Sequence, residues 1–418
     1  MVIQFKTSNY RSIYHPQTIN FRATNLSSEN KEVDNKNIAN VGSYRILKSM
    51  GIYGANASGK SNIIKAFQFF KNMVSHSLTS EDLSKSEINP FKQSTDKMDN
   101  YGYFEIVLLV ETKKYRYGFT LSQNANIDSE WLYGPAEKNE TYYFTRKNDI
   151  LTVNPLWFQE GDDLPKEKLR SDALFLSFCA SYDGNVSTSI RNFIHGKITF
   201  DQFSNSSRAR SLLGINANRS TDSLIESGKK EVILRWMKEV GLLFSDVKLD
   251  KIEISGKHYG NFVSFSKYVY NSNGEIKGNI PMNLNEDESQ GTKKFYSYIG
   301  RLHQKFEEGG LFISDEIDSN FHPTLLQKLI SYFNNSNVNK TNAQILFTSH
   351  DTNLMNPELM RRDQFYFTEK SLIDETILYS LADLKGIRNN ADFARQYLAG
   401  VYGALPVLGN YLEEDSAN

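Results

Sequence analysis

The segment GANASGKS, residues 54–61, constrains the fold of this chain more than any other stretch. It matches the pattern G-x-x-x-x-G-K-[ST], in which two glycines allow tight turns so that successive backbone N–H groups can face an anion. The residues before it, KSMGIY, are typical of a buried strand, and the residues from Ser61 onward are typical of a helix. A glycine-rich turn without a ligand is the alternative, but the flanking strand and helix favour a phosphate-binding loop.

Each fixed position of this loop has a chemical reason. Gly54 and Gly59 permit the turns, and Lys60 can bring a positive charge to the β- and γ-phosphates of a nucleotide. Ser61 offers a hydroxyl to Mg²⁺, so ATP and Mg²⁺ are the expected cofactors. The residues that we predict to contact the nucleotide are Gly54, Asn56, Gly59, Lys60, Ser61 and Asn62.

A second group of chemically suitable residues lies far along the chain. The apolar run LFIS ends in Asp315 and Glu316. Asp315 suits the carboxylate on the Mg²⁺ side of a phosphate-loop site, and Glu316 suits a general base for the attacking water. A further apolar run, QILFTS, ends in His350. For the run LFIS, the alternative is an ordinary strand that ends in exposed acids.

Composition excludes several classes of protein. The 418 residues carry a net charge of −1, so no global field attracts nucleic acid or a membrane surface. The only cysteine, Cys179, cannot form an internal disulfide, and we expect it to be a buried core residue. Because no apolar run reaches the length of about 18 residues typical of a membrane span, we expect a cytoplasmic protein without a membrane partner.

Strands and helices alternate at both ends of the chain, which predicts a mainly parallel sheet divided by a long insertion. Alternating apolar residues over 101–178 predict antiparallel strands, with a further strand at ALFLSFCAS, whereas residues 185–244 are mainly helical in pattern. The polar stretch 24–43 is predicted to be a loop.

These motifs resemble the ABC-type ATPase heads of the SMC and OLD proteins. DEIDSNFHP is similar to their acidic strand and D-loop, with Asp318 as the D-loop carboxylate, and FTSHD places His350 at the switch histidine. ESQGT lies where the signature is expected, so the resemblance implies that Ser289 and Gly291 contact the γ-phosphate bound to the opposite subunit.

A narrower resemblance is to compact bacterial ATPases of the RloA and AbiLi type, which are associated with anti-phage defence and commonly pair with a second protein. It covers most of the chain, through segments such as FKTSNYRSI, YRYGF, SEWLY, ALFLS, RRDQFYF and QYLAGVYGALPVL. Arg11 in NYRS is similar to a family position near the nucleotide, with a surface arginine as the alternative. ABC heads sense Mg²⁺ with a glutamine that follows a strand of the lobe. No glutamine follows ALFLSFCAS, and Gln93 is a candidate for this role only as a substitute.

The resemblance implies an α/β fold of the phosphate-loop NTPase class, an ABC-ATPase head with a mixed sheet core, an antiparallel β lobe and a helical insertion. The expected divisions are an N-terminal part of the head (1–180), the helical insertion (181–250) and a C-terminal part (251–418). The resemblance also implies a homodimer or higher homo-oligomer joined through an ATP sandwich.

Three functional hypotheses follow. The first is an Mg²⁺-dependent ATPase that controls an effector protein in phage defence. The second is a scaffold that holds ATP with little turnover and sequesters a toxin. The third is an SMC-like ATPase that handles DNA through basic stretches at 206–220 and at Lys229 and Lys230, for which a solvated surface is the alternative. A nuclease is not expected, because no acidic metal-binding pattern occurs outside the ATP site.

Overall fold

The strand that leads into the glycine loop lies in the middle of a six-stranded sheet. The computed structural model describes residues 1–80, 88–95, 102–122, 124–137, 139–148, 150–201, 219–254 and 257–406. The order of this sheet is β11-β15-β16-β5-β17-β18, parallel except for the last strand. Its strands are β5 (Ser49–Gly54), β11 (Ile198–Phe200), β15 (Leu311–Ser314), β16 (Gln344–Thr348), β17 (Phe365–Lys370) and β18 (Thr376–Ser380).

This sheet unites the two ends of the chain. The N-terminal strand β5 is buried along its whole length and pairs with β16 on one side and β17 on the other. Because all three strands run in the same direction, their carboxyl ends meet at one edge of the sheet, where a ligand site of an open α/β sheet is expected. The predicted sheet divided by a long insertion is thus confirmed, as is the mixed character of the sheet.

A seven-stranded antiparallel sheet forms a lobe beside it, in the order β10-β9-β8-β7-β6-β1-β2. Its strands are β1 (Val2–Ser8), β2 (Gln17–Asn20), β6 (Tyr103–Val110), β7 (Lys113–Leu121), β8 (Ile127–Pro135), β9 (Glu140–Lys147) and β10 (Ile150–Val153). The lobe confirms the antiparallel strands expected from the alternating residues of this region.

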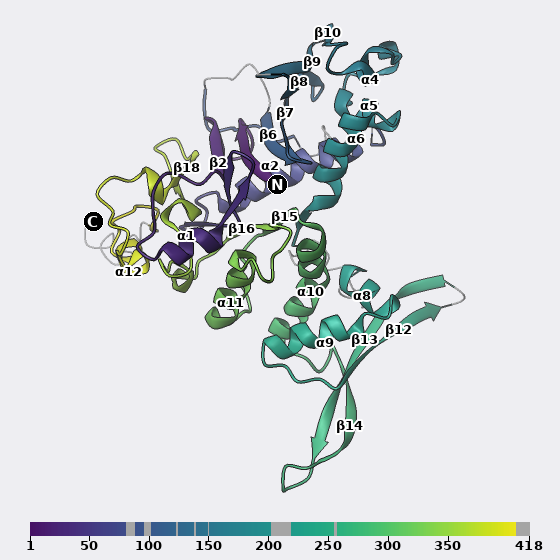
Figure 1. Cartoon of the computed structure of the whole chain (residues 1–418), viewed down its shortest axis with the longest axis vertical. Helices are drawn as coiled ribbons and strands as arrows, with labels where there is room; N and C mark the ends of the chain where they lie inside the picture. The colour runs from purple at the N-terminus through teal and green to yellow at the C-terminus, as the bar shows by residue number, and fades with distance from the viewer. Residues whose placement is uncertain are drawn as a thin grey trace, which may run out of the picture.

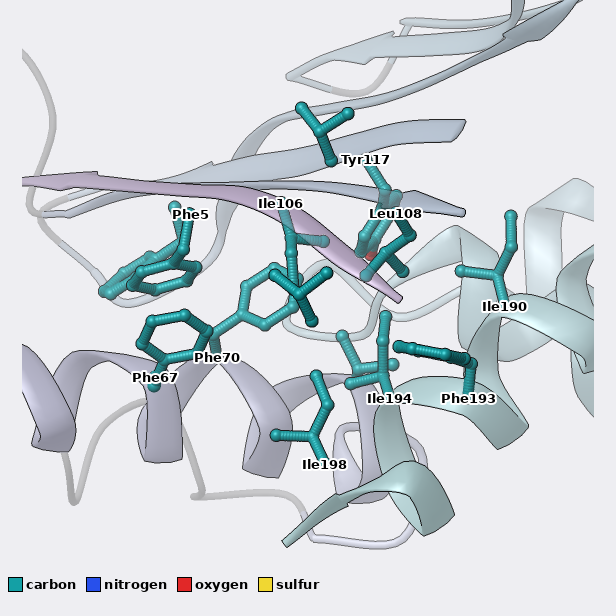
Figure 2. Close-up of a cluster of buried hydrophobic side chains, with 14 of the residues drawn as sticks. Phe5, Phe67, Phe70, Ile106, Leu108, Tyr117, Ile190, Phe193, Ile194 and Ile198 are labelled. Carbon is teal, nitrogen blue, oxygen red and sulfur yellow. The ribbon is translucent and has the colours of Figure 1, made fainter. Parts of the chain in front are cut away.

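Helix α2 (Lys60–His76), which begins at the glycine loop, packs against the lobe (Figure 2). Phe67 of α2 stacks on Phe5 of β1 with 3.6 Å between ring centroids, and Phe70 stacks on Phe119 of β7 at 5.6 Å. Figure 2 also shows Ile190 and Ile194 closing the other end of this cluster. The aromatic face of α2 therefore holds the helix, and with it the glycine loop, against the lobe.

The segment after the lobe differs from its predicted structure. Residues Phe175–Ser181 form helix α5 rather than a strand, because the buried carboxylate of Glu130 accepts the N–H groups of Phe175 and Leu176 at 2.7 and 2.9 Å and caps the helix. Cys179 lies in this helix and is fully buried, as predicted. The other elements here are α4 (Gln159–Asp162), η1 (Lys166–Lys168), α6 (Asn185–Asn192) and the π-helical turn η2 (Phe193–Lys197). The expected helical pattern is interrupted by β11, which pairs with β15.

The predicted loop at 24–43 is also partly wrong. Helix α1 (Lys31–Asn37) is capped by Asn30, whose side chain accepts the N–H of Glu32, and β3 (Ile38–Val41) then forms a hairpin with β4 (Tyr44–Leu47). The side chain of Asp34 pairs with Arg361, which lies far along the chain. This long-range ion pair stabilises a polar segment whose own composition indicates no helix.

An arm projects from the body of the molecule (Figure 1). It consists of α8 (Arg219–Glu226), α9 (Lys230–Glu239) and the sheet β12 (Asp246–Ile254), β13 (Lys257–Tyr270) and β14 (Ile276–Asn283). The basic stretch 206–220 lies almost wholly outside the described residues, and Lys230 forms an ion pair with Asp246 at 2.7 Å.

The arm leads into the C-terminal part of the chain. The remaining elements are α10 (Gln290–Glu308), α11 (Pro323–Asn334), η3 (Thr352–Leu354), η4 (Arg362–Gln364), η5 (Leu381–Asp383) and α12 (Phe393–Leu398). Beyond β16 the chain forms the short 3-10 turn η3, which does not continue the alternation of strands and helices predicted for this end of the chain. In YLAGVYGALP, Tyr397, Tyr402 and Ala404 are buried whereas Leu398 and Val401 are exposed, so only part of this segment belongs to the core. No helix in the described part of the chain has both the length and the apolar character to span a bilayer.

Candidate functional site

The glycine loop connects the end of β5 to the start of α2, and its two glycines are needed for different contacts. Gly54 has a φ of 150°, and a Cβ there would collide with the backbone oxygen of Thr368. Gly59 has a φ of 109°, and a Cβ there would collide with the hydroxyl of Thr376. Only glycine can occupy both positions without moving β17 and β18, so the loop is built into the edge of the sheet.

The ammonium group of Lys60 lies within the loop and donates to the carbonyl oxygens of Gly54 and Ala55 at 2.8 and 2.9 Å. Burial lowers the pKa of Lys60, while the negative charges of Asp315, Glu316 and Asp318 act in the opposite direction. Strands β5 and β15 both pair in parallel with β16, so the loop after β5 and the acids after β15 lie at the same end of these strands. The two predicted halves of the site meet at one edge of the sheet.

A threonine on the neighbouring strand orients the first acid. The hydroxyl of Thr348 donates to Oδ1 of Asp315 at 2.6 Å and accepts the backbone N–H of Glu316 at 2.7 Å. Thr348 is fully buried, Asp315 is half-buried and Glu316 is exposed. One carboxylate is thus anchored to the sheet while the next extends into solvent, which is the division expected between a metal ligand and a residue that contacts water.

Residues 315–320, which follow β15 and contain these acids, form a loop with an unusual backbone, and we call it the acidic loop. Glu316 and Asn320 both have positive φ angles, 49° and 63°, a conformation that non-glycine residues seldom adopt. Both carboxylate oxygens of Asp318 lie 3.3 Å from the backbone nitrogen of His350, which donates to them. The structure therefore brings together Asp315, Glu316, Asp318 and His350. His350 is exposed.

Arg11 and Asn62 lie on the other flank of the glycine loop. The amide of Asn62 donates to the hydroxyl of Ser12 at 2.6 Å, and the Ser12 carbonyl accepts the N–H of Thr376 at 2.7 Å. Arg11 has a φ of 54° in this turn, and its guanidinium lies over the ring of Tyr10. The contacts to Asn62 and Thr376 belong to Ser12, so a position of Arg11 near the nucleotide remains a prediction.

Asn56 is exposed in the loop, and Ser61 is half-buried in the first turn of α2. The substitute glutamine, Gln93, donates to Asp374 at 3.0 Å on the surface. Asp374 belongs to the turn between β17 and β18, so this contact connects Gln93 to the sheet edge and not to the acids after β15.

Ser289 caps helix α10, since its hydroxyl oxygen accepts the N–H of Thr292 at 3.2 Å. Gly291 packs against the acidic loop, and a Cβ there would lie 2.7 Å from the backbone oxygen of Asn320. Ser289 itself is exposed. The helix start is observed, whereas the predicted contact of Ser289 and Gly291 with a second chain's phosphate remains a prediction.

Three residues that sequence reasoning missed support this site. Thr348 orients the acids, Thr376 packs against Gly59 and donates to the Ser58 carbonyl at 3.0 Å, and Lys294 binds the backbone of the acidic loop. Thr348 could have been noticed as the hydroxyl residue two positions before His350. Thr376 and Lys294 act only through tertiary contacts, so their local sequence carries no signal.

The oxygens predicted to hold a metal are the hydroxyl of Ser61 and the carboxylate of Asp315. Such hard oxygen donors suit Mg²⁺, which takes one or two protein ligands and completes its shell with phosphate oxygens and water. Within the described ranges no three His, Cys, Asp or Glu side chains gather into a metal-binding group. The residues present therefore fit a nucleotide-bound Mg²⁺ better than a metal held by protein alone.

A comparison with protein families matches residues 49–356 to the family described as "AAA domain, putative AbiEii toxin, Type IV TA system". The match begins at β5 and ends just after His350. It therefore includes the glycine loop, the acids after β15 and the end of β16. A search of curated proteins found no match.

Among solved structures, the chain is similar to the SMC head domain from Thermotoga maritima, with 13% identity and a TM-score of 0.42 over 91% of this chain and 98% of that chain. It is also similar to the Smc head domain with an extended coiled coil, bound to the C-terminal domain of ScpA, from Pyrococcus furiosus. The identity is 14% and the TM-score 0.39, over 96% of this chain and 99% of that chain. The Smc head domain with a coiled coil and joint from Pyrococcus yayanosii gives 10% and 0.43 over the same shares.

Proposed function

The chain belongs to the AAA-domain family whose model it matches over residues 49–356, and from this premise we propose that it is an Mg²⁺-dependent ATPase. It dimerises on ATP and acts as a switch that controls a partner effector in anti-phage defence. The observation that supports this most is the meeting of the glycine loop and the acidic strand end, since β5 and β15 both pair in parallel with β16 and end at the same edge of the sheet.

Each residue of the site has a separate role in hydrolysis. The backbone N–H groups of the loop and Lys60 bind the phosphates, and Ser61 and Asp315 would hold Mg²⁺, which neutralises charge on the phosphate oxygens when bound. Glu316 is exposed beside the anchored Asp315 and can orient and deprotonate the attacking water. His350 contacts the γ-phosphate and the same water in this proposal, and Asp318 holds the backbone of His350 in place.

The site is completed by a second copy of the chain. The N-terminus of α10 carries a partial positive charge, and exposed Ser289 together with Gly291, two residues later, would present it to the γ-phosphate of the opposite subunit. ATP then joins two heads, and its hydrolysis releases them. This dimer is the element through which ATP would control an effector.

Turnover separates an ATPase from a static scaffold. Phosphate release by the wild type should clearly exceed release by Lys60→Ala, which loses the charge at the phosphates. Equal, negligible release by both proteins would reject the ATPase and favour a scaffold that holds ATP.

Dimerisation is tested by light scattering after size exclusion. Glu316→Gln should bind ATP, fail to hydrolyse it and elute as a dimer with Mg²⁺ and ATP. Ser289→Arg, introduced into Glu316→Gln, should bind ATP and remain a monomer. A monomeric Glu316→Gln protein in ATP would reject the sandwich mechanism.

The role in defence is the least direct part of the proposal. The family description refers to a toxin–antitoxin system, which supports action together with a second protein. Cells that carry the gene with its native neighbours should restrict phage plating, and Lys60→Ala should abolish restriction. Equal plating on both strains, across a panel of phages, would argue against this role.

A further inference from the structure

Lys294 is a buried lysine one turn into helix α10, with 1% of its surface exposed. Its ammonium group donates to three backbone carbonyls of the acidic loop, those of Glu316, Ile317 and Ser319, at 3.1, 3.1 and 2.9 Å. It also donates to the hydroxyl of Ser319 at 2.7 Å. The group lies 4.9 Å from the ring centroid of Phe321. A buried charge is costly unless it is well bonded, so these contacts hold a precise arrangement of the loop.

The loop that Lys294 binds is the one with positive φ angles at Glu316 and Asn320. Such a backbone persists only where its surroundings define it, and the carbonyls of Glu316, Ile317 and Ser319 all meet the same ammonium group. The charges of Glu316 and Asp318 act on Lys294 as well as on Lys60. The acidic loop is joined to the first turn of α10 through Lys294 and through the close approach of Gly291 to Asn320.

That first turn is the part of α10 that faces a second chain in the proposed dimer. Ser289 caps it and Gly291 packs against Asn320. In that dimer the first turn of α10 contacts the nucleotide of the partner, whereas Glu316 acts on the nucleotide of its own chain. A displacement of the turn by the partner's ATP would reach Glu316 through the bonds of Lys294.

We propose that Lys294 is a positioning residue that couples the two ATP sites of the dimer, by joining the helix turn that faces the partner's nucleotide to the backbone of Glu316. This inference rests on the two-chain site proposed above. Its distinctive consequence is cooperativity: occupation of one site arranges Glu316 for hydrolysis at the other. Turnover should then depend on ATP concentration with a Hill coefficient above unity.

The same helix offers a matched control. Lys305 is also fully buried and its ammonium group also donates to a backbone carbonyl, that of Lys197 at 2.8 Å, but this carbonyl lies outside the acidic loop. Lys294→Met and Lys305→Met therefore each remove one buried amino group from the same helix. Thermal unfolding and ATP binding by both variants, in the Glu316→Gln background, report on folding and on the glycine loop.

Phosphate release is measured against ATP concentration for the wild type, Lys294→Met and Lys305→Met. We expect Lys294→Met to lower maximal turnover about tenfold and to bring the Hill coefficient to unity while ATP affinity is kept. Lys305→Met should retain wild-type turnover and cooperativity. Ser319→Ala, which removes the shortest contact of Lys294, should reduce cooperativity even if Lys294→Met fails to fold.

Three results would overturn the coupling alone: a wild-type Hill coefficient of unity, a folded Lys294→Met protein that behaves like Lys305→Met, or unchanged cooperativity in Ser319→Ala. Wild-type turnover no higher than that of Lys60→Ala would overturn the proposed ATPase, and the coupling with it.

Discussion

The hydroxyl of Thr348 lies 2.6 Å from Oδ1 of Asp315, and the same hydroxyl accepts the N–H of Glu316 at 2.7 Å. One side chain on β16 thus sets the position of both acids that follow β15. The two strands are neighbours in the sheet but are separated in the chain by helix α11. The geometry of the acids is consequently a property of the sheet and not of the LFISDE segment.

Replacing Thr348 with valine should impair hydrolysis without preventing ATP binding. The change leaves the N–H of Glu316 without its partner and frees Asp315 to rotate, at a cost of about 1–3 kcal/mol. If that cost falls on the transition state, turnover drops about tenfold to a hundredfold. Thr348→Ser keeps the hydroxyl and should retain most of the activity. Equal phosphate release by the two variants would contradict this role.

Replacing Gly59 with alanine should weaken ATP binding. The residue has a left-handed φ of 109°, and a Cβ would collide with the hydroxyl of Thr376, so the loop must move. A strain of about 1–3 kcal/mol corresponds to a Kd at least about fivefold higher. Gly278→Ala is the control, since no atom lies within 4 Å of a Cβ at Gly278. Calorimetry that found the same affinity in both variants would show that this close approach is unimportant.

Lys305 should make stability depend on pH. Burial lowers its pKa from 10.5 to about 7, so between these values the unfolded chain holds a proton that the folded chain lacks. The contribution to stability is therefore present above 10.5 and is lost as pH falls towards 7, by on the order of a few kcal/mol. Lys305→Met should remove this dependence. The test is the difference between the unfolding free energies of the two proteins at pH 7 and pH 10, and a constant difference would contradict the shifted pKa.

Glu130 should be essential to the stability of the lobe. Its fully buried carboxylate accepts the hydroxyl of Tyr117 at 2.9 Å and the N–H groups that begin α5, with Arg146 at 3.9 Å. Burial raises its pKa despite these partners. Glu130→Ala leaves the N–H groups of Phe175 and Leu176 without their acceptor and removes the buried negative charge beside Arg146, and we expect a loss of about 3–5 kcal/mol. Exposed Glu137→Ala should change stability little, and equal thermal midpoints would refute the prediction.

Elements with strong local patterns were predicted well. The strand, glycine loop and helix at 49–76, the antiparallel strands of the lobe and the C-terminal alternation all follow from residue periodicity and glycine placement. The errors occur where a distant partner decides the local structure. Glu130 converts ALFLSFCAS from a strand into a helix, and Arg361 stabilises the polar segment around Asp34.

By itself, the sequence determined the identity of the phosphate loop and the acids, because each chemical role needs a particular residue type at a particular spacing. It could not determine how these residues meet, because that depends on which strands pair and in which register. Only the tertiary structure placed β5 between β16 and β17, set Asp315 against Thr348, and bound the acidic loop to Lys294. These contacts join residues that are remote in the chain, and their energy comes from burial and hydrogen bonds that exist only once the sheet has assembled.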